Sequence, residues 1–328
     1  MLTAYQRKDA QLQRVHAVNF VEIEKDTVWI DLHNPTEDEE GIAEDALRLN
    51  LPTREEMRDI EESSRLYAEN GALYMTATVP AFSDSDYPST TEITFVLTPR
   101  CLVTVRYAEP KSFRAFASHA ERQPNVCQSA ESTLAGLIQA IQSRIADILE
   151  RVAADNDSLS RRVLDRPQVQ IKRADGKLDF EDLLRRLGRN QTLVAKSRES
   201  LMSVTRLMGF LSRSNPEVQI SAGLRDELSV LVHDARSLID HTAYLSGNIN
   251  FELDAILGML SAEQSSIIKI FTVAAVVFLP PTLVASIYGM NFDFMPELAW
   301  KLGYPFALLL MVLSVVFPYA WFKRKGWL

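Results

Sequence analysis

The sequence predicts an N-terminal α/β domain, a long helical stalk and two C-terminal transmembrane helices. Three observations support this fold class. Residues 15–127 alternate short β-branched runs, such as Thr27 to Leu32 and Ala72 to Ala81, with polar helical stretches. From about residue 129 the apolar residues instead recur every three or four positions, which is the helical period. Finally, two stretches of about 21 to 23 residues near the C-terminus carry no charge, a length that can span a bilayer.

Composition narrows the class of protein. The 328 residues are 47% hydrophobic and 24% charged, which suits a folded protein of about two domains. The net charge of -8 argues against a nucleic-acid partner and is compatible with handling cations. Cys101 and Cys127 stand in no metal-binding or redox motif, so we expect reduced thiols. Met1 to Asp9 precede no apolar segment, so the pattern is not that of a secretory signal and predicts a cytoplasmic N-terminal part.

Residues 1–128 are expected to form the cytoplasmic α/β domain. Its clearest hairpin pairs Glu92 to Leu97 with Cys101 to Tyr107, because Pro99 in the intervening turn cannot continue a central strand. Two helix starts have the Ser/Thr-x-x-Glu spacing of a capping box, in which each side chain satisfies a backbone donor. They are Thr36 with Glu39 and Thr53 with Glu56.

Residues 129–214 are expected to form a cytoplasmic helical hairpin. The first helix is marked by apolar residues at helical spacing: Leu134, Ile138, Ile141, Ile145, Ile148, Val152 and Leu159. Asp165-Arg166-Pro167 and Asp175-Gly176 interrupt the pattern. The second helix runs from about Phe180 to Leu211.

Residues 215–291 are expected to form the stalk helix, which continues into the first transmembrane helix. Asn215-Pro216-Glu217 has an N-cap residue, a proline at the first helical position and an acid in the first turn. From Leu224 to Ile249 apolar residues follow a 4,3 alternation, typical of a helix that packs along a shallowly crossing partner. A helix reaching Met290 would be about 110 Å long at ~1.5 Å per residue.

The membrane segments are expected at about residues 270–290 and at 302–322, joined by a periplasmic loop at 292–301. Aromatic residues cluster near the predicted interfaces: Trp300, Tyr304, Tyr319, Trp321 and Trp327. This favours membrane spans over the alternative, two buried helices of a soluble core. Lys269 and the basic cytoplasmic tail at 323–328 place both termini in the cytoplasm by the positive-inside rule. Two spans cannot enclose a water-filled path, so a pore requires several copies of the chain.

The triplet Gly289-Met290-Asn291 at the end of the first span resembles the signature of the CorA family of magnesium channels. The following residues 292–298, Phe-Asp-Phe-Met-Pro-Glu-Leu, resemble the extracellular loop of that family. The resemblance is close over residues 267–328, and the layout of the rest agrees with it. It implies a funnel-shaped homopentamer in the inner membrane. It also implies potential-driven influx of Mg²⁺, with Co²⁺ and Ni²⁺ as further cargo, and gating by cytoplasmic Mg²⁺ without any other cofactor.

The resemblance also implies roles for particular residues. Gly289, Met290 and Asn291 would form the selectivity filter. Because Mg²⁺ sheds its waters reluctantly, a ring of neutral amide oxygens can recognise the hydrated ion and still release it. The alternative for Asn291 is a simple helix C-cap. Residues matching the pore lining and gate of the family are Phe271, Leu279 and Thr282; for the first two, ordinary lipid or helix packing is the alternative.

Charged residues near the spans have two interpretations each. Asp293 and Glu297 would attract cations to the loop, or they are solvated loop charges. Lys323, Arg324 and Lys325 would form a basic ring at the inner end of the pore, or they only anchor the topology. Acids that could sense cytoplasmic Mg²⁺ are plentiful, and no local motif assigns a sensor among them: Glu37 to Glu40, Asp84, Asp86, Asp226, Asp234, Asp240 and Asp254.

Other classes of function have less support. No HExxH motif, no Ser/His/Asp order and no glycine-rich phosphate loop is evident, so the sequence gives no basis for an enzyme. A zinc transporter of the same architecture is a rival, but such relatives depart from the triplet that is intact here. A membrane-tethered sensor or scaffold is a rival of another class. An anchor has no need of the polar Asn291 followed by an acidic loop.

Overall fold

The computed structural model describes residues 1–8, 11–16, 26–59, 61–164, 180–213, 219–290, 295–296 and 300–325. The chain divides into two compact units, Met1–Leu253 and Asp254–Leu328. The first unit holds all the strands that the structure describes and most of its helices.

The centre of the first unit is a seven-stranded sheet with the order β2-β1-β3-β7-β6-β5-β4. Its strands are β1 (Leu2–Lys8), β2 (Gln11–His16), β3 (Thr27–His33), β4 (Leu66–Glu69), β5 (Ala72–Ala81), β6 (Ser89–Leu97) and β7 (Leu102–Arg106). The pair β3 and β7 is parallel, and the other neighbours in the sheet are antiparallel. The mixed sheet therefore confirms the predicted α/β class of this region.

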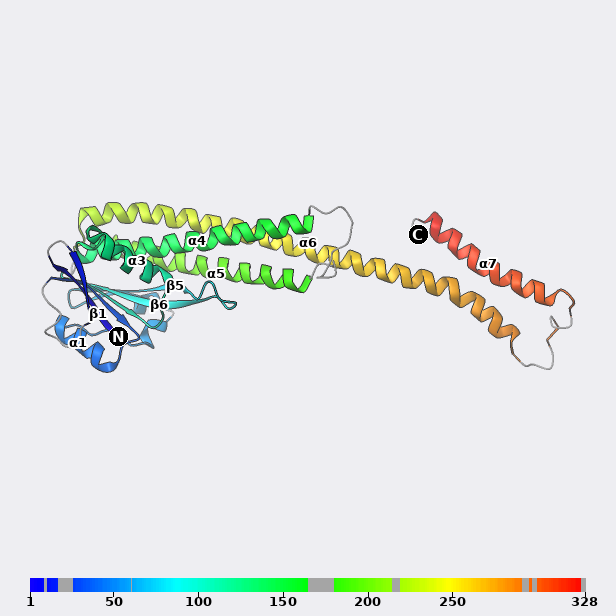
Figure 1. Cartoon of the computed structure of the whole chain (residues 1–328), viewed down its shortest axis with the longest axis horizontal. Coiled ribbons are helices and arrows are strands. Elements are labelled where there is room, and N and C mark those ends of the chain that lie inside the picture. Colours follow the sequence, from blue (N-terminus) through cyan, green and yellow to red (C-terminus); the bar gives the residue numbers. More distant parts are fainter. Residues whose placement is uncertain are drawn as a thin grey trace. The chain divides into compact units, whose positions relative to one another are not determined.

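Both faces of the sheet are covered, as Figure 1 shows. On one face, alternate residues such as Ile30, Leu32 and Val103 pack with the helix α1 (Glu37–Leu47). On the other face, Trp29 stacks on Tyr5 with ring centroids 4.2 Å apart and also contacts the helix α3 (Lys111–Arg122). The opposite directions of successive side chains along a strand explain how one sheet supports two cores.

The local signals predicted for this domain are confirmed. β6 and β7 form the expected hairpin, in which Leu97 pairs with Leu102. Thr36 and Glu39 make a complete capping box at the start of α1. At the second box, the Thr53 N–H donates to the Glu56 carboxylate at 2.8 Å, and the element that follows is the short 3₁₀ helix η2 (Glu56–Arg58). Two other short helices are α2 (Glu62–Arg65) and η3 (Pro124–Cys127).

Three long helices follow: α4 (Ala130–Leu164), α5 (Phe180–Leu211) and α6 (Ala222–Tyr288). The first two match the predicted helical hairpin. The start of α6 corrects the prediction of a helix beginning at Asn215, because residues 219–221 are not helical. Ser221 supplies the cap instead: its hydroxyl accepts a hydrogen bond from the Leu224 N–H at 3.2 Å. Residues 214–218 lie outside the described part of the chain.

The second unit contains the C-terminal part of α6 and the helix α7 (Gly303–Arg324). Both helices are long and apolar enough to span a membrane by length and composition. The most apolar stretch of α6 is 0% buried, and that of α7 is 11% buried. Core helices of a soluble protein are mostly buried, so these two helices differ from them. Pro280 and Pro281 lie inside α6, and the helix continues through them.

Candidate functional site

The C-terminal end of α6 is where the sequence places the selectivity residues. The helix ends at Tyr288, and the Gly289 N–H still donates to the Ala285 carbonyl at 2.9 Å. A Cβ atom at Gly289 would lie 3.0 Å from that same carbonyl oxygen, which is tighter than ordinary contacts. Glycine therefore fits the last turn of the helix better than any larger residue. Met290 follows with 46% of its surface exposed.

Three of the other predicted positions in this region cannot be placed. Asn291, Asp293 and Glu297 lie outside the described residues. The roles that the sequence gives to them remain predictions.

The candidate pore residues share one side of α6. At about 100° per residue, Phe271, Thr282 and Gly289 point within roughly 20° of one another, and Leu279 lies roughly 60° from Thr282. Phe271 and Leu279 are 72% and 66% exposed within the single chain. The Thr282 hydroxyl donates to the Phe278 carbonyl at 2.7 Å, so its oxygen remains available as an acceptor on this side.

The basic residues predicted for the inner end of the pore lie together at the end of α7. Lys323 and Arg324 occupy its last turn, and Lys325 follows directly. All three are exposed, and the Lys325 ammonium lies 5.7 Å from the centre of the Trp321 ring. Cations at a helix C-terminus interact favourably with the helix dipole, which stabilises this arrangement whatever its further role.

The candidate sensor acids fall into two groups. Some are engaged within the chain: Glu39 accepts from the N-terminal ammonium at 2.7 Å, and Glu40 accepts from the Tyr107 hydroxyl at 3.1 Å. Others are exposed to solvent in the single chain, namely Asp86, Asp226, Asp234, Asp240 and Asp254. Among the described residues, no three His, Cys, Asp or Glu side chains form a group that could hold a metal ion.

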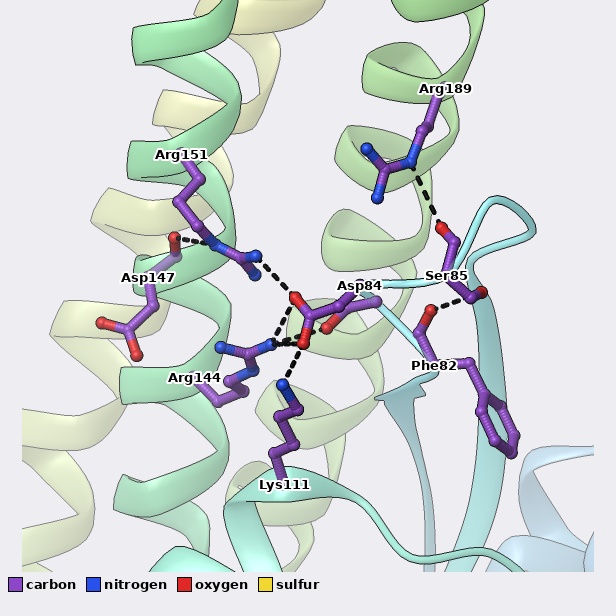
Figure 2. Close-up of polar contacts among 9 residues, drawn as sticks. Phe82, Asp84, Ser85, Lys111, Arg144, Asp147, Arg151 and Arg189 are labelled. Atoms are coloured by element: carbon purple, nitrogen blue, oxygen red, sulfur yellow. Dashed lines mark hydrogen bonds and ion pairs between the residues drawn. The ribbon is translucent and has the colours of Figure 1, made fainter.

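Asp84 is the most heavily paired of these acids (Figure 2). It lies in the turn between β5 and β6 and forms ion pairs with Lys111, with Arg144 at 3.1 Å and with Arg151 at 2.5 Å. Hydrogen bonds from Lys111 and Arg151, together with the charge of Arg144, hold the pKa of this carboxyl well below its usual range. A metal ion binding to Asp84 would have to displace these cations.

A buried acid of the stalk, Glu252, was not singled out by the sequence. The side chain is 7% exposed, and its Oε1 accepts from the Asn156 amide on α4 at 2.9 Å. Within the described part of the chain, Glu252 Oε2 and Asn156 Oδ1 have no hydrogen-bond partner. Burial raises the pKa of Glu252 to about 7; the Ser160 hydroxyl opposes this shift and the nearby acids Asp157 and Asp155 add to it. The apolar spacing of α6 gives no signal for this contact, because it depends on the neighbouring helix.

The comparison with known proteins decides the family. The model of the CorA-like Mg2+ transporter protein family matches residues 24–324. The chain belongs to this family. It is also 35% identical to a magnesium transport protein CorA of Pasteurella multocida and 34% identical to that of Escherichia coli, in each case over 100% of both chains. Members of the CorA family are ion transporters in membranes, so the chain is a membrane transporter and not an enzyme.

Solved structures support the CorA-type fold. The chain matches the complete structure of the CorA magnesium transporter from Methanocaldococcus jannaschii with a TM-score of 0.75 at 17% identity, covering 100% of this chain and 99% of that one. It matches the full-length CmaX protein with a TM-score of 0.68 at 14% identity, covering 99% and 97% of the two chains. At these identities the matches show the fold alone. They confirm the predicted order of α/β domain, long helix and two C-terminal apolar helices.

Proposed function

We propose that the chain is one protomer of a homopentameric channel that conducts Mg²⁺ into the cell across the inner membrane. Co²⁺ and Ni²⁺ would be carried as well. The observation that carries the proposal is membership of the CorA family together with an intact Gly289-Met290-Asn291 triplet at the end of the first candidate span. Both termini would be cytoplasmic, and residues 292–301 would face the periplasm.

The chemistry of the triplet suits a hydrated ion. Mg²⁺ holds its waters in octahedral geometry and loses them reluctantly. A ring of Asn291 amide oxygens can accept hydrogen bonds from those waters and remains neutral, whereas a ring of carboxylates at the same place would release the ion more slowly. The acids Asp293 and Glu297 would raise the local cation concentration, an effect that added salt weakens. Below the filter, Thr282 would offer an oxygen, and Leu279 and Phe271 would form apolar constrictions.

Assembly from several copies is supported by a stripe of exposed apolar residues on the stalk. Val230, Tyr244 and Phe251 are 59%, 63% and 64% exposed and lie at multiples of seven residues along α6. A heptad spacing keeps side chains on one side of a helix that supercoils with a partner. Burial of three large apolar side chains against neighbouring copies would remove them from water. The number five comes from the family and not from this spacing.

The driving force would be the membrane potential. A divalent ion gains roughly 4.6 kcal/mol for each 100 mV of inside-negative potential, so uptake needs no chemical energy source. Closure would follow the binding of cytoplasmic Mg²⁺ to acids between protomers, with the exposed acids of α6 as the pool of ligands. Loss of that ion would loosen the stalks.

The direct test is Mg²⁺ uptake into proteoliposomes with an imposed inside-negative potential and low internal Mg²⁺. We expect wild type to conduct and Asn291→Ala to lose most of the flux. Asn250→Ala, an exposed position of the same helix, is the matched control and should conduct like wild type. If wild type passes no Mg²⁺ under these conditions, the proposal is wrong. Uptake of Zn²⁺ in place of Mg²⁺ would favour the zinc-transporter alternative, and no ion flux at all would favour a membrane-tethered sensor.

Gating and selectivity need a second measurement in the same vesicles. We expect uptake to fall as internal Mg²⁺ is raised into the millimolar range, and we expect Co²⁺ and Ni²⁺ to compete with Mg²⁺ for entry. Uptake that does not depend on internal Mg²⁺ would contradict gating while leaving conduction in place.

A further inference from the structure

A cavity of about 360 Å³ lies in the cytoplasmic unit where the β5–β6 turn meets the helices α4 and α5. Its polar lining consists of Ser83, Arg151, Asp155, Arg186, Arg189 and Asn190. The apolar part of the lining comes from Ile148, Val152 and Leu193. Three arginines thus converge on one cavity in a chain whose net charge is -8.

The arginines are not neutralised one for one. Arg151 pairs with Asp84, but that single carboxylate also serves Lys111 and Arg144. Arg186 pairs with Asp155, which is the one carboxylate in the described lining of the cavity. In these ion pairs two carboxylates, Asp84 and Asp155, thus serve four cations.

Arg189 has N–H groups that are available for further hydrogen bonds. Its Nε donates to the Ser85 carbonyl at 3.2 Å, and within the described part of the chain its guanidinium makes no other hydrogen bond. Figure 2 shows Arg189 on α5 and Arg151 on α4, both directed toward the space between the two helices. A guanidinium has five N–H donors in a planar fork, so each of these groups can donate further hydrogen bonds to an oxyanion.

Neutral polar groups of the lining can contribute as well. Ser83 is 7% exposed, and its oxygen accepts from Arg144 at 2.8 Å, which leaves the hydroxyl hydrogen to be donated. Asn190 is 4% exposed, and its amide holds the Asp155 carboxylate at 2.8 Å. This contact, together with Arg186, keeps the carboxylate of the lining occupied.

We propose that this cavity binds a small molecule bearing a phosphate group, with Arg189 and Arg151 as its principal ligands. Arginine forms paired, charge-assisted hydrogen bonds to phosphate oxygens, which match the planar fork. The volume exceeds what a bare phosphate needs and lies in the range of small-molecule sites. An organic part of the ligand would lie on the apolar side of the cavity. A bound anion would link α4, α5 and the β5–β6 turn and so stabilise the cytoplasmic unit.

The test is isothermal titration of the purified full-length protein in detergent with ADP, inorganic phosphate and adenosine. The buffer contains EDTA, so that removal of Mg²⁺ by the nucleotide cannot imitate binding. We expect saturable binding of ADP, weaker binding of inorganic phosphate and none of adenosine. Binding of phosphate as tightly as ADP would still support the site and would show that the organic part adds nothing. Equal binding of adenosine and ADP would overturn the proposal, as would no saturable binding of either phosphate compound.

Two substitutions on α5 distinguish a site from general attraction to positive charge. Arg189→Gln should weaken ADP binding at least tenfold. Arg185→Gln removes the same charge from an exposed position, where the side chain is 72% exposed and pairs with Glu181 at 3.5 Å, and it should change the affinity less than twofold. Equal losses in the two variants would overturn the proposal. If Arg189→Gln does not fold, Arg189→Lys keeps the charge but not the fork, and should bind ADP several-fold more weakly. The outcome is independent of the transport proposal, which the vesicle experiment tests separately.

Discussion

Replacement of Glu252 by glutamine should remove a specific pH dependence of stability. Glu252 is buried between helices, and one of its oxygens and the Asn156 Oδ1 have no partner among the described residues. A proton on the Glu252 Oε2 would let the carboxyl group donate to an acceptor while Oε1 still accepts from the amide. Glutamine reproduces this neutral state, because its amide can donate and accept in the same way.

The magnitude follows from the pKa. Burial raises the pKa of Glu252 from 4.5 to about 7 in the folded state, whereas the unfolded chain keeps the ordinary value. Between these two values the folded state binds more protons than the unfolded state, so stability falls as the pH rises. At ~1.36 kcal/mol per pKa unit the total loss is on the order of 3 kcal/mol. The loss begins above the unfolded pKa and is complete once the pH exceeds the folded pKa.

Trp29 provides the assay. It is 1% exposed in the sheet, and the other tryptophans, Trp300, Trp321 and Trp327, can be replaced by phenylalanine. Urea unfolding followed by Trp29 fluorescence then reports on the first unit, Met1–Leu253. The difference in free energy of unfolding between wild type and Glu252→Gln should change by about 3 kcal/mol from pH 4.5 to pH 8, since other groups cancel in the difference. A difference that is constant with pH would refute a raised pKa for this group.

Three further predictions follow from packing and charge. Gly136→Ala places a Cβ 2.5 Å from a Phe116 ring carbon and should cost about 1–3 kcal/mol of stability in the same unfolding assay. The control is Gly188→Ala, where nothing lies within 4 Å of the added Cβ; it should be neutral or stabilise by about 0.5–1 kcal/mol. Arg106 is 9% exposed and forms an ion pair with Asp31 at 2.8 Å. Asp31→Asn removes the charge partner of this buried guanidinium and should lower the free energy of unfolding in urea by about 3–5 kcal/mol. A loss below ~1 kcal/mol would show that the pair is not essential. Gly289→Ala crowds the last turn of α6 and should reduce Mg²⁺ flux in vesicles without lowering the stability of the first unit, Met1–Leu253. Unchanged flux would contradict a tight filter geometry.

The sequence by itself determined the class of the protein and the order of its parts. A hydrophobic period of two predicts a strand, a period of three to four predicts a helix, and an uncharged run of about 20 residues predicts a membrane span. All three are local properties of the sequence, so they could be recognised without the structure. The hairpin around Pro99 and the capping box of Thr36 are also local. The short motif at Gly289 identified the family, because a few contiguous residues carry it.

Only the tertiary structure decided which charged side chains form ion pairs and hydrogen bonds within the chain. The sequence treats Asp84 as one acid among many, and the fold brings to it Lys111 from α3 and two arginines, Arg144 and Arg151, from α4. The same holds for the contact of Glu252 with a residue on α4 and for the convergence of arginines on one cavity. Side chains distant along the chain meet only after the helices pack. The pKa of such a group depends on burial and on those neighbours, so no local pattern can predict it.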